Sequence, residues 1–262
     1  MKRSELAHAQ IDALLDLWKG LPEVRVVLVG AAALAAQMDM RWRCTNDLDV
    51  SVVAEQSDLE RRLRGLGWEP RERVELRWTS NSGAVVDVIP VALSSLAARQ
   101  LVFPRSGHVM SLVGFDLALQ HVTRLQLEGN FAIEMAIVPV IAILKMTAWL
   151  DRPWEREKDL HDIAHILTHY LEPDDMRRWD DSMIHVGLPY EQQGAFGLGQ
   201  DIAAIVGSEH RVLIERFLAA VSDEALGHAM VFGRCFGMFD GWHVAEARLD
   251  AFRCGLGCRT TP

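Results

Sequence analysis

Three aspartates on predicted strands are the residues of this chain best suited to chemistry. Asp47 and Asp49 stand at the mouth of a strand predicted over residues 49–53, and Asp87 lies inside a second strand predicted over residues 84–91. Because side chains i and i+2 of a strand project from the same face, Asp47 and Asp49 point together. Three converging carboxylates repel one another unless cations hold them. Two Mg²⁺ ions about 4 Å apart would remove that repulsion and bind nucleotide phosphates.

A purely structural interpretation of the same aspartates is available. Asp47 would cap a turn, Asp49 would be solvated, and Asp87 would belong to an edge strand. An Asp-x-Asp segment alone favours this interpretation. Asp87 argues against it, because an aspartate in the middle of an apolar strand has little structural reason to be there unless it faces a site.

A glycine turn ahead of the aspartates supplies a second feature of a phosphate site. Residues 24–29 form a short β-branched run, Gly30 ends it, and residues 31–37 favour a helix. Backbone N–H groups at such a strand-to-helix turn can donate to phosphate oxygens. Thr45, two residues before Asp47, could add a hydroxyl.

Lys145 is the only charged residue in the apolar stretch 136–150. A buried lysine is costly without an anion, and a bound nucleotide phosphate would serve that need. Two alternatives stay open: Lys145 reaches solvent along its own methylene stem, or it pairs with a structural carboxylate.

The overall composition limits the kind of protein that can carry these residues. The chain has 262 residues, is half apolar, and has a formal net charge of −9, so disorder and a globally basic nucleic-acid binder are both excluded. Its four cysteines are too few and too unevenly placed for a disulfide-built fold, and they indicate a cytoplasmic location. The most membrane-like stretch, residues 131–150, contains a proline and two charges, so we expect a strand followed by a buried helix and no membrane contact.

The pattern of elements predicts an α/β domain over residues 1–137 and a helical domain over residues 138–262. Helices and strands alternate in the first part, and a helix over residues 57–66 is expected to be capped by Ser57. From residue 139 onward the periodicity is helical. We expect a mixed sheet in the first domain, and an active site in a cleft that the helical domain completes.

The order of these features resembles the nucleotidyltransferase superfamily related to DNA polymerase β. More narrowly, the chain resembles the abortive-infection nucleotidyltransferases that serve as toxins in type IV toxin–antitoxin systems. Those chains carry a glycine turn and then an R-x-T-x-D-[ILV]-D motif, matched here by Arg43, Thr45, Asp47, Leu48 and Asp49. The resemblance covers about residues 24–170.

The resemblance also implies roles for residues in the second half. The family lysine in an apolar helix corresponds to Lys145, which would offset charge on the phosphates. A K-D-x-x-D helix that lines the nucleotide site corresponds to Lys158, Asp159 and Asp162. The second glycine or serine of the turn is Ala31 here, which keeps the backbone N–H but lacks a hydroxyl.

The expected reaction is Mg²⁺-dependent transfer of a nucleoside monophosphate from an NTP to an acceptor hydroxyl. Asp47, Asp49 and Asp87 would bind the metal, and Asp87 would also accept the proton of the acceptor. The resemblance implies that the acceptor is RNA, often a tRNA 3′ end, or a protein, and that the partner is a cognate antitoxin. Two alternatives are a transferase that modifies a small molecule such as an antibiotic, and a catalytically decayed protein that binds a nucleotide or an antitoxin.

A metal-dependent phosphohydrolase is an alternative from another class. His161, His165 and His169 recur at helical spacing, and His161 precedes Asp162. Such enzymes need further histidine and aspartate ligands from other helices, and the remaining histidines of this chain sit in no recognisable ligand motif.

Overall fold

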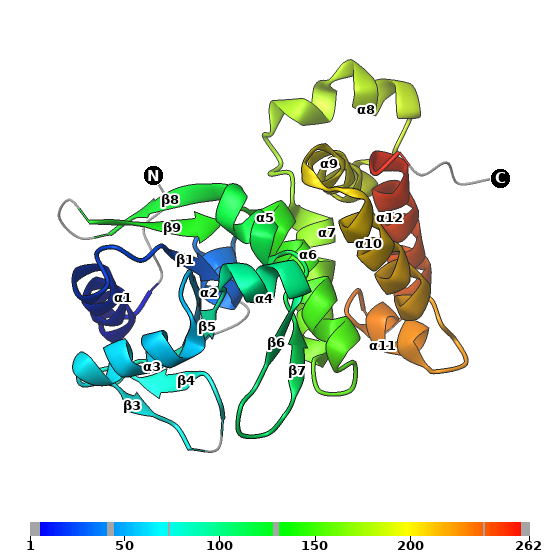
Figure 1. Ribbon diagram of the computed structural model, residues 1–262. Coiled ribbons are helices and arrows are strands. Elements are labelled where there is room, and N and C mark those ends of the chain that lie inside the picture. Colours follow the sequence, from blue (N-terminus) through cyan, green and yellow to red (C-terminus); the bar gives the residue numbers. More distant parts are fainter. Residues whose placement is uncertain (1–5, 41–44, 73, 128–130, 238, 258–262) are drawn as a thin grey trace. The chain divides into compact units, whose positions relative to one another are not determined.

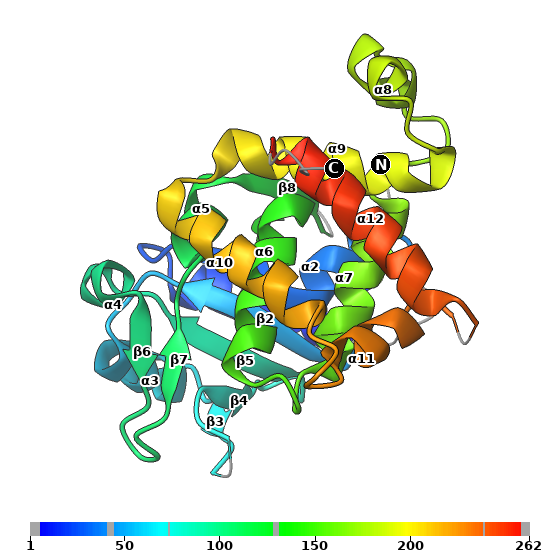
Figure 2. The same ribbon diagram turned by 90° about the vertical axis from the view of Figure 1, so that its right-hand side faces the viewer.

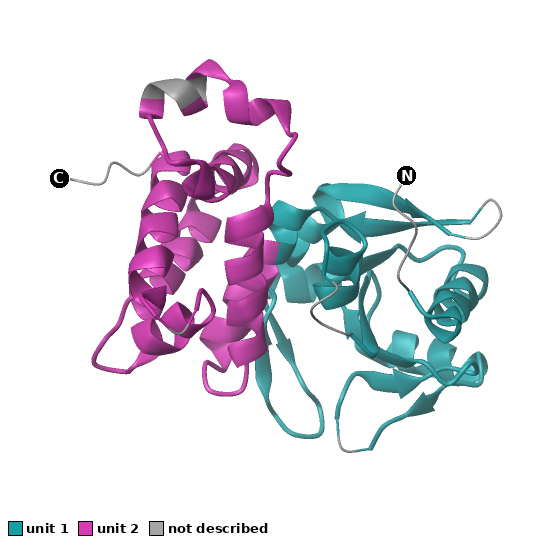
Figure 3. Cartoon of the chain, turned by 180° about the vertical axis from the view of Figure 1, so that it is seen from behind, with its two compact units in different colours: residues 1–141 teal, residues 142–262 magenta. Residues whose placement is uncertain are grey.

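The computed structural model describes residues 6–40, 45–72, 74–127, 131–237 and 239–257, apart from the side chains of residues 182, 184 and 185. The chain divides into two compact units, residues 1–141 and 142–262 (Figure 3). Within the described residues, no helix is both long enough and apolar enough to cross a membrane. Each unit is described by itself below.

The first unit is built on a mixed β-sheet. In its described residues, seven strands pair in the order β3-β4-β5-β2-β1-β9-β8. The pairs β2–β5 and β1–β9 are parallel and the other neighbours are antiparallel. The strands are β1 (Val26–Val29), β2 (Asp47–Val52), β3 (Glu69–Pro70), β4 (Arg77–Thr79), β5 (Val85–Pro90), β8 (Val122–Gln126) and β9 (Ala132–Ala136). β6 (Gln100–Val102) and β7 (Val109–Ser111) form a separate antiparallel pair.

Apolar side chains of this sheet and its helices form the core of the first unit. Leu28 of β1 and Val50 of β2 are fully buried, as are Leu14 and Leu17. The last two lie on one face of the first helix, at the i, i+3 spacing of an amphipathic helix. The helices are α1 (His8–Gly20), α2 (Gly30–Ala35), α3 (Gln56–Gly65), α4 (Leu93–Ala98) and α5 (Phe115–Gln120) (Figure 1).

The second unit is helical. Its described elements are α7 (Glu157–His169), the 3₁₀ helix η1 (Met176–Trp179), α8 (Asp181–Val186), α9 (Tyr190–Ile205), α10 (Ser208–Val221), α11 (His228–Arg234) and α12 (Gly241–Gly255). α6 (Val138–Asp151) starts at the end of the first unit and continues into the second. The predicted α/β fold with a mixed sheet, followed by helices, is confirmed.

Two helices of the second unit approach each other so closely that the two positions where they cross leave no room for a side chain. α9 and α12 lie side by side in both views (Figures 1 and 2). A Cβ atom added at Gly199 would overlap the carbonyl oxygen of Phe252, and one added at Gly255 would overlap the carbonyl oxygen of Phe196. Glycine is therefore required at both crossing positions.

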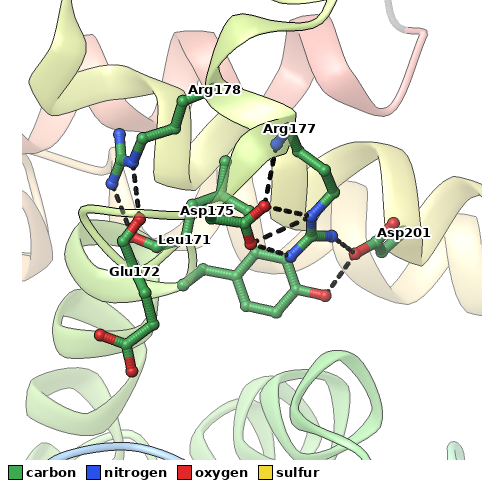
Figure 4. A network of polar contacts seen from close by, with 7 residues as sticks. Leu171, Glu172, Asp175, Arg177, Arg178 and Asp201 are labelled. Carbon is green, nitrogen blue, oxygen red and sulfur yellow. Dashed lines mark hydrogen bonds and ion pairs between the residues drawn. The ribbon is translucent and has the colours of Figure 1, made fainter.

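A polar network holds the segment that connects α7 to α9. Arg177 donates to both carboxylate oxygens of Asp175 and, at 2.9 Å, to Asp201 (Figure 4). The neighbouring Arg178 is buried and donates to the carbonyl oxygens of Leu171 (2.6 Å) and Glu172 (2.9 Å). These bonds satisfy carbonyl groups beyond the end of α7 that no helical N–H reaches.

One local prediction is wrong. The residue that precedes α3 is Glu55, in an extended conformation and without a side-chain capping bond, and Ser57 lies within the helix. In the first turn of α3, Gln56 donates to Glu60 at 3.1 Å. The helix starts earlier because Glu55 already has extended backbone angles and its carbonyl accepts from Leu59.

Candidate active site

The three aspartates lie on two neighbouring parallel strands. Asp47 and Asp49 belong to β2, Asp87 belongs to β5, and Asp49 is aligned directly with Asp87 in the register of this pair. Aligned residues of parallel strands project from the same face, and so does Asp47, two residues before Asp49. The structure therefore brings the three predicted carboxylates to one face of the sheet.

The glycine turn lies against this group. Gly30 follows β1 and begins α2, with φ +68°, a left-handed conformation that glycine adopts without strain. A Cβ atom added at Gly30 would overlap the carboxylate of Asp49. Because β1 and β2 are antiparallel neighbours that pair Val29 with Asp49, the turn and the Asp49 carboxylate meet at one end of the sheet.

A cation that the sequence analysis missed lies between two of the aspartates. Arg77 of β4 donates through Nε to Asp87 Oδ1 and through Nη2 to Asp87 Oδ2, both at 2.7 Å. The same Nη2 donates to Asp47 Oδ2 at 3.0 Å. One guanidinium group therefore joins the predicted ligands of β2 and β5. Counting outward from a turn at residues 80–83 would place Arg77 opposite Val86, whereas the structure pairs Thr79 with Val85 and therefore Arg77 with Asp87.

Three further residues of the predicted motif differ in their surroundings. The hydroxyl of Thr45 lies 3.2 Å from the backbone oxygen of Asp47 and 3.4 Å from Asp47 Oδ1, so Thr45 contacts the first aspartate. Ala31 is buried in the first turn of α2. Arg43 lies outside the described residues.

The donor set fits Mg²⁺ in its chemistry. Carboxylate oxygens are the protein ligands that Mg²⁺ prefers, and Asp47, Asp49 and Asp87 share a face of the sheet. As the side chains stand, no group of three or more His, Cys, Asp or Glu side chains within the described residues is arranged around a metal position. The hydrogen bonds of Arg77 to Asp47 and Asp87 account for the directions of those two carboxylates.

The second unit contains a buried cluster of a lysine and two carboxylates. Lys145 of α6 is 5% exposed, and its Nζ lies 3.0 Å from Asp159 Oδ1 and in contact with Asp162 Oδ2. Asp159 and Asp162 are adjacent on the inner face of α7 and are 4% and 0% exposed. Burial alone would lower the pKa of Lys145, but the charges and hydrogen bonds of the two aspartates outweigh it and raise that pKa. Their carboxylates supply the negative charge that a buried lysine needs.

In the structure, Lys158 does not share the surroundings of Asp159 and Asp162, the residues of the same sequence motif. Lys158 is exposed on α7, whereas Asp159 and Asp162 point inward to Lys145. The histidines considered for a hydrolase share α7, where the rings of His165 and His169 lie 4.6 Å apart. Among the described residues they form no group of three that could hold a metal.

Comparison with known families decides the class of the protein. Residues 12–226 match the family described as the nucleotidyl transferase AbiEii toxin of the type IV toxin–antitoxin system. The chain belongs to the AbiEii family. This AbiEii-family protein is accordingly a nucleotidyltransferase, and the matched span includes every residue of the two clusters described above.

The solved structures to which this AbiEii-family chain is similar have low sequence identity to it. An antigenic nucleotidyltransferase-like protein from Paracoccidioides brasiliensis is 14% identical, with a TM-score of 0.43, covering 88% of this chain and 94% of that one. The antibiotic-resistance factor ANT(2'')-Ia is 13% identical, with a TM-score of 0.42 and coverages of 86% and 98%. JHP933 from Helicobacter pylori is 13% identical, with a TM-score of 0.41 and coverages of 97% and 93%. A comparison with curated proteins finds no match.

Proposed function

We propose that this nucleotidyltransferase uses Mg²⁺ to transfer a nucleoside monophosphate from an NTP to a hydroxyl group of RNA, such as the 3′ end of a tRNA, and that it acts as a toxin. The observation that carries the proposal is the alignment of Asp49 with Asp87 beside the Gly30 turn. Membership of the AbiEii family supports the toxin role.

Asp47, Asp49 and Asp87 are the residues that would hold two Mg²⁺ ions. Bound Mg²⁺ would offset the charge of the triphosphate and of the leaving pyrophosphate. Asp87 accepts the proton of the acceptor hydroxyl while that oxygen bonds to the α-phosphorus and the bond to pyrophosphate breaks. The Asp49 carboxylate lies against the Gly30 turn, and the Thr45 hydroxyl contacts Asp47.

Backbone groups of the turn are assigned to the triphosphate. The N–H groups of Gly30 and Ala31 begin α2, where the first donors of a helix have no acceptor within the helix. They would donate to phosphate oxygens. Four further residues stay predicted nucleotide contacts: Lys145, Lys158, Asp159 and Asp162. It also stays a prediction that Lys145 offsets charge on the phosphates.

The acceptor is tested by supplying each α-labelled NTP with Mg²⁺ to the purified full chain, together with total tRNA or a mixture of aminoglycosides. We expect label in tRNA, absent with Asp49→Asn and retained with Asp58→Asn. Asp58 is a matched control because its ion pairs with Arg61 and Arg62 lie on the surface of α3. Label in the aminoglycosides alone would instead support a small-molecule acceptor, which the net charge of −9 also favours. No label in either would indicate decayed chemistry.

The toxin role is tested separately in cells. Expression of the wild-type chain should arrest growth, and Asp49→Asn should abolish the arrest at equal protein level. Relief of the arrest by the product of a neighbouring gene would identify the antitoxin. Growth arrest that persists with Asp49→Asn would contradict a toxin activity based on nucleotidyl transfer.

A further inference from the structure

The pairing of β4 with β5 directs Arg77 toward the aspartates. β4 pairs antiparallel with β5 so that Arg77 lies opposite Asp87. The residue before it, Leu76, has φ +68°, an uncommon conformation for a branched side chain. Its carbonyl accepts from the N–H of Val88 at 2.8 Å, which fixes the start of the strand. The backbone therefore presents Arg77 to the face that carries Asp47 and Asp87.

The contacts of Arg77 use the oxygens that a metal would need. Its guanidinium binds both oxygens of Asp87 in a two-pronged arrangement and also reaches Asp47 Oδ2. Such paired bonds between arginine and carboxylate have a defined geometry and are stronger than single neutral bonds. The hydrogen bonds with Asp87 raise the pKa of Arg77 in spite of its partial burial, so the group stays charged. A cation bound to these carboxylates would have to replace it.

The exposure of the cluster allows that replacement. The side chains of Arg77, Asp47 and Asp87 are 28%, 32% and 22% exposed, so water screens their attraction. One positive charge faces three carboxylates, since Asp49 also acts on Arg77 electrostatically. A divalent ion balances this negative charge better than one guanidinium does.

We propose that Arg77 is a built-in competitor of the divalent cation: it holds Asp47 and Asp87 closed together, and the cation binds only as Arg77 leaves them. The inference rests on the proposed function, because it concerns the same three aspartates as metal ligands. Arg77 is thus a positioning residue, which sets the cation concentration at which the site opens.

The test measures Mn²⁺ binding to the full chain without nucleotide, from the loss of the free-ion signal in electron paramagnetic resonance. The variants are Arg77→Ala, Arg77→Gln, and Arg77→Lys, which keeps the charge. Arg25→Ala is the matched control, because Arg25 makes a comparable 2.7 Å ion pair with Glu134 on the same sheet. Unfolding curves identify any variant that fails to fold. If Arg77→Ala fails, Arg77→Gln takes its place, because glutamine is the longer of the two neutral replacements.

We expect the neutral variants to bind Mn²⁺ at least about fivefold more tightly than wild type, the factor that matches the loss of an ion pair of about 1 kcal/mol. Arg77→Lys should fall between them and wild type, and Arg25→Ala should bind as wild type does. If wild type binds Mn²⁺ and Asp49→Asn abolishes that binding, the metal site is present. Equal or weaker Mn²⁺ binding by the neutral variants would then overturn only the proposed role of Arg77. Absence of Mn²⁺ binding in all variants would overturn the metal site itself.

Discussion

Asp49 and Asp87 lie directly opposite each other on the parallel strands β2 and β5, and the Asp49 carboxylate rests against Gly30. Two strands and one turn thus fix the second and third aspartates relative to each other before any ligand binds. Preorganised charged groups are what transfer to a phosphorus centre requires, because its catalysis depends on positioning and electrostatics.

Gly30→Ala should abolish most transfer activity. Its new Cβ atom would displace the Asp49 carboxylate, and a shift of about 1 Å at a catalytic group can lower the rate about 100-fold. Gly83→Ala is the matched control, because Gly83 has φ +83° but open space around its Cα. Both variants should lose about 1–2 kcal/mol of unfolding free energy from backbone strain, measured in urea. Equal activity losses in the two variants would show that strain, and not the Asp49 contact, is responsible.

Lys145→Met should destabilise the protein by about 3–5 kcal/mol, because it removes the cation that both buried carboxylates contact and leaves Asp159 with the more distant Arg156, at 3.8 Å. Replacing Asp159 and Asp162 by asparagine in the same chain should recover part of this loss. Urea unfolding of the single and triple variants measures both effects. A single variant as stable as wild type would mean that Lys145 is not the counter-ion of the two aspartates.

The same cluster predicts a pH dependence of stability at alkaline pH. The pKa of Lys145 is raised in the folded state, so folding favours the protonated amine. Its contribution should be complete below the ordinary lysine pKa of about 10.4 and decline as the pH rises through the raised pKa. The stability difference between wild type and Lys145→Met should therefore shrink as the pH rises through the alkaline range. A difference that stays constant as the pH rises through the alkaline range, while both proteins remain folded, would contradict this assignment.

Arg178→Met should destabilise the segment between α7 and α9 more than Arg177→Met does. Arg178 is buried and donates to carbonyl oxygens of Leu171, Glu172 and Tyr190, and its loss leaves the buried Leu171 carbonyl without this donor, at a cost of about 1–3 kcal/mol. Arg177 is half-exposed, and its ion pairs are worth about 1 kcal/mol or less. Amide hydrogen exchange across residues 171–193 measures the local effect. Equal exchange rates in the two variants would contradict this ranking.

Much of the first unit could be predicted because its strands are short apolar runs bounded by turns. The strand at Val26–Val29, the turn at Gly30 and the hairpin strand that carries Asp87 all have unambiguous local patterns. The start of β4 could not be predicted, since residues 73–79 look uniformly extended and only Arg77–Thr79 pair with β5. Pairing is a long-range property that alternation in one segment does not specify.

The charged residues show where sequence patterns lose information. That Lys145 is buried followed from its apolar neighbours, but its partners did not, because Asp159 and Asp162 resemble a solvated helix face with Lys158. The structure turns the two aspartates inward and leaves Lys158 exposed. Arg77 escaped notice for a similar reason: a lone strand arginine has no motif, and its meaning appears only with the register that places it opposite Asp87.

Asp87 should act in the transfer reaction together with Asp47 and Asp49. The most direct test is the single-turnover rate of label transfer from an α-labelled NTP for wild type, Asp87→Asn and Glu134→Gln, each at saturating Mg²⁺. Glu134 is the control because it is also a strand carboxylate paired with an arginine in the same sheet. Asp87→Asn should lower the rate by about 10²-fold or more while Glu134→Gln leaves it within about twofold of wild type. A rate for Asp87→Asn close to that of wild type would show that Asp87 takes no part in the transfer.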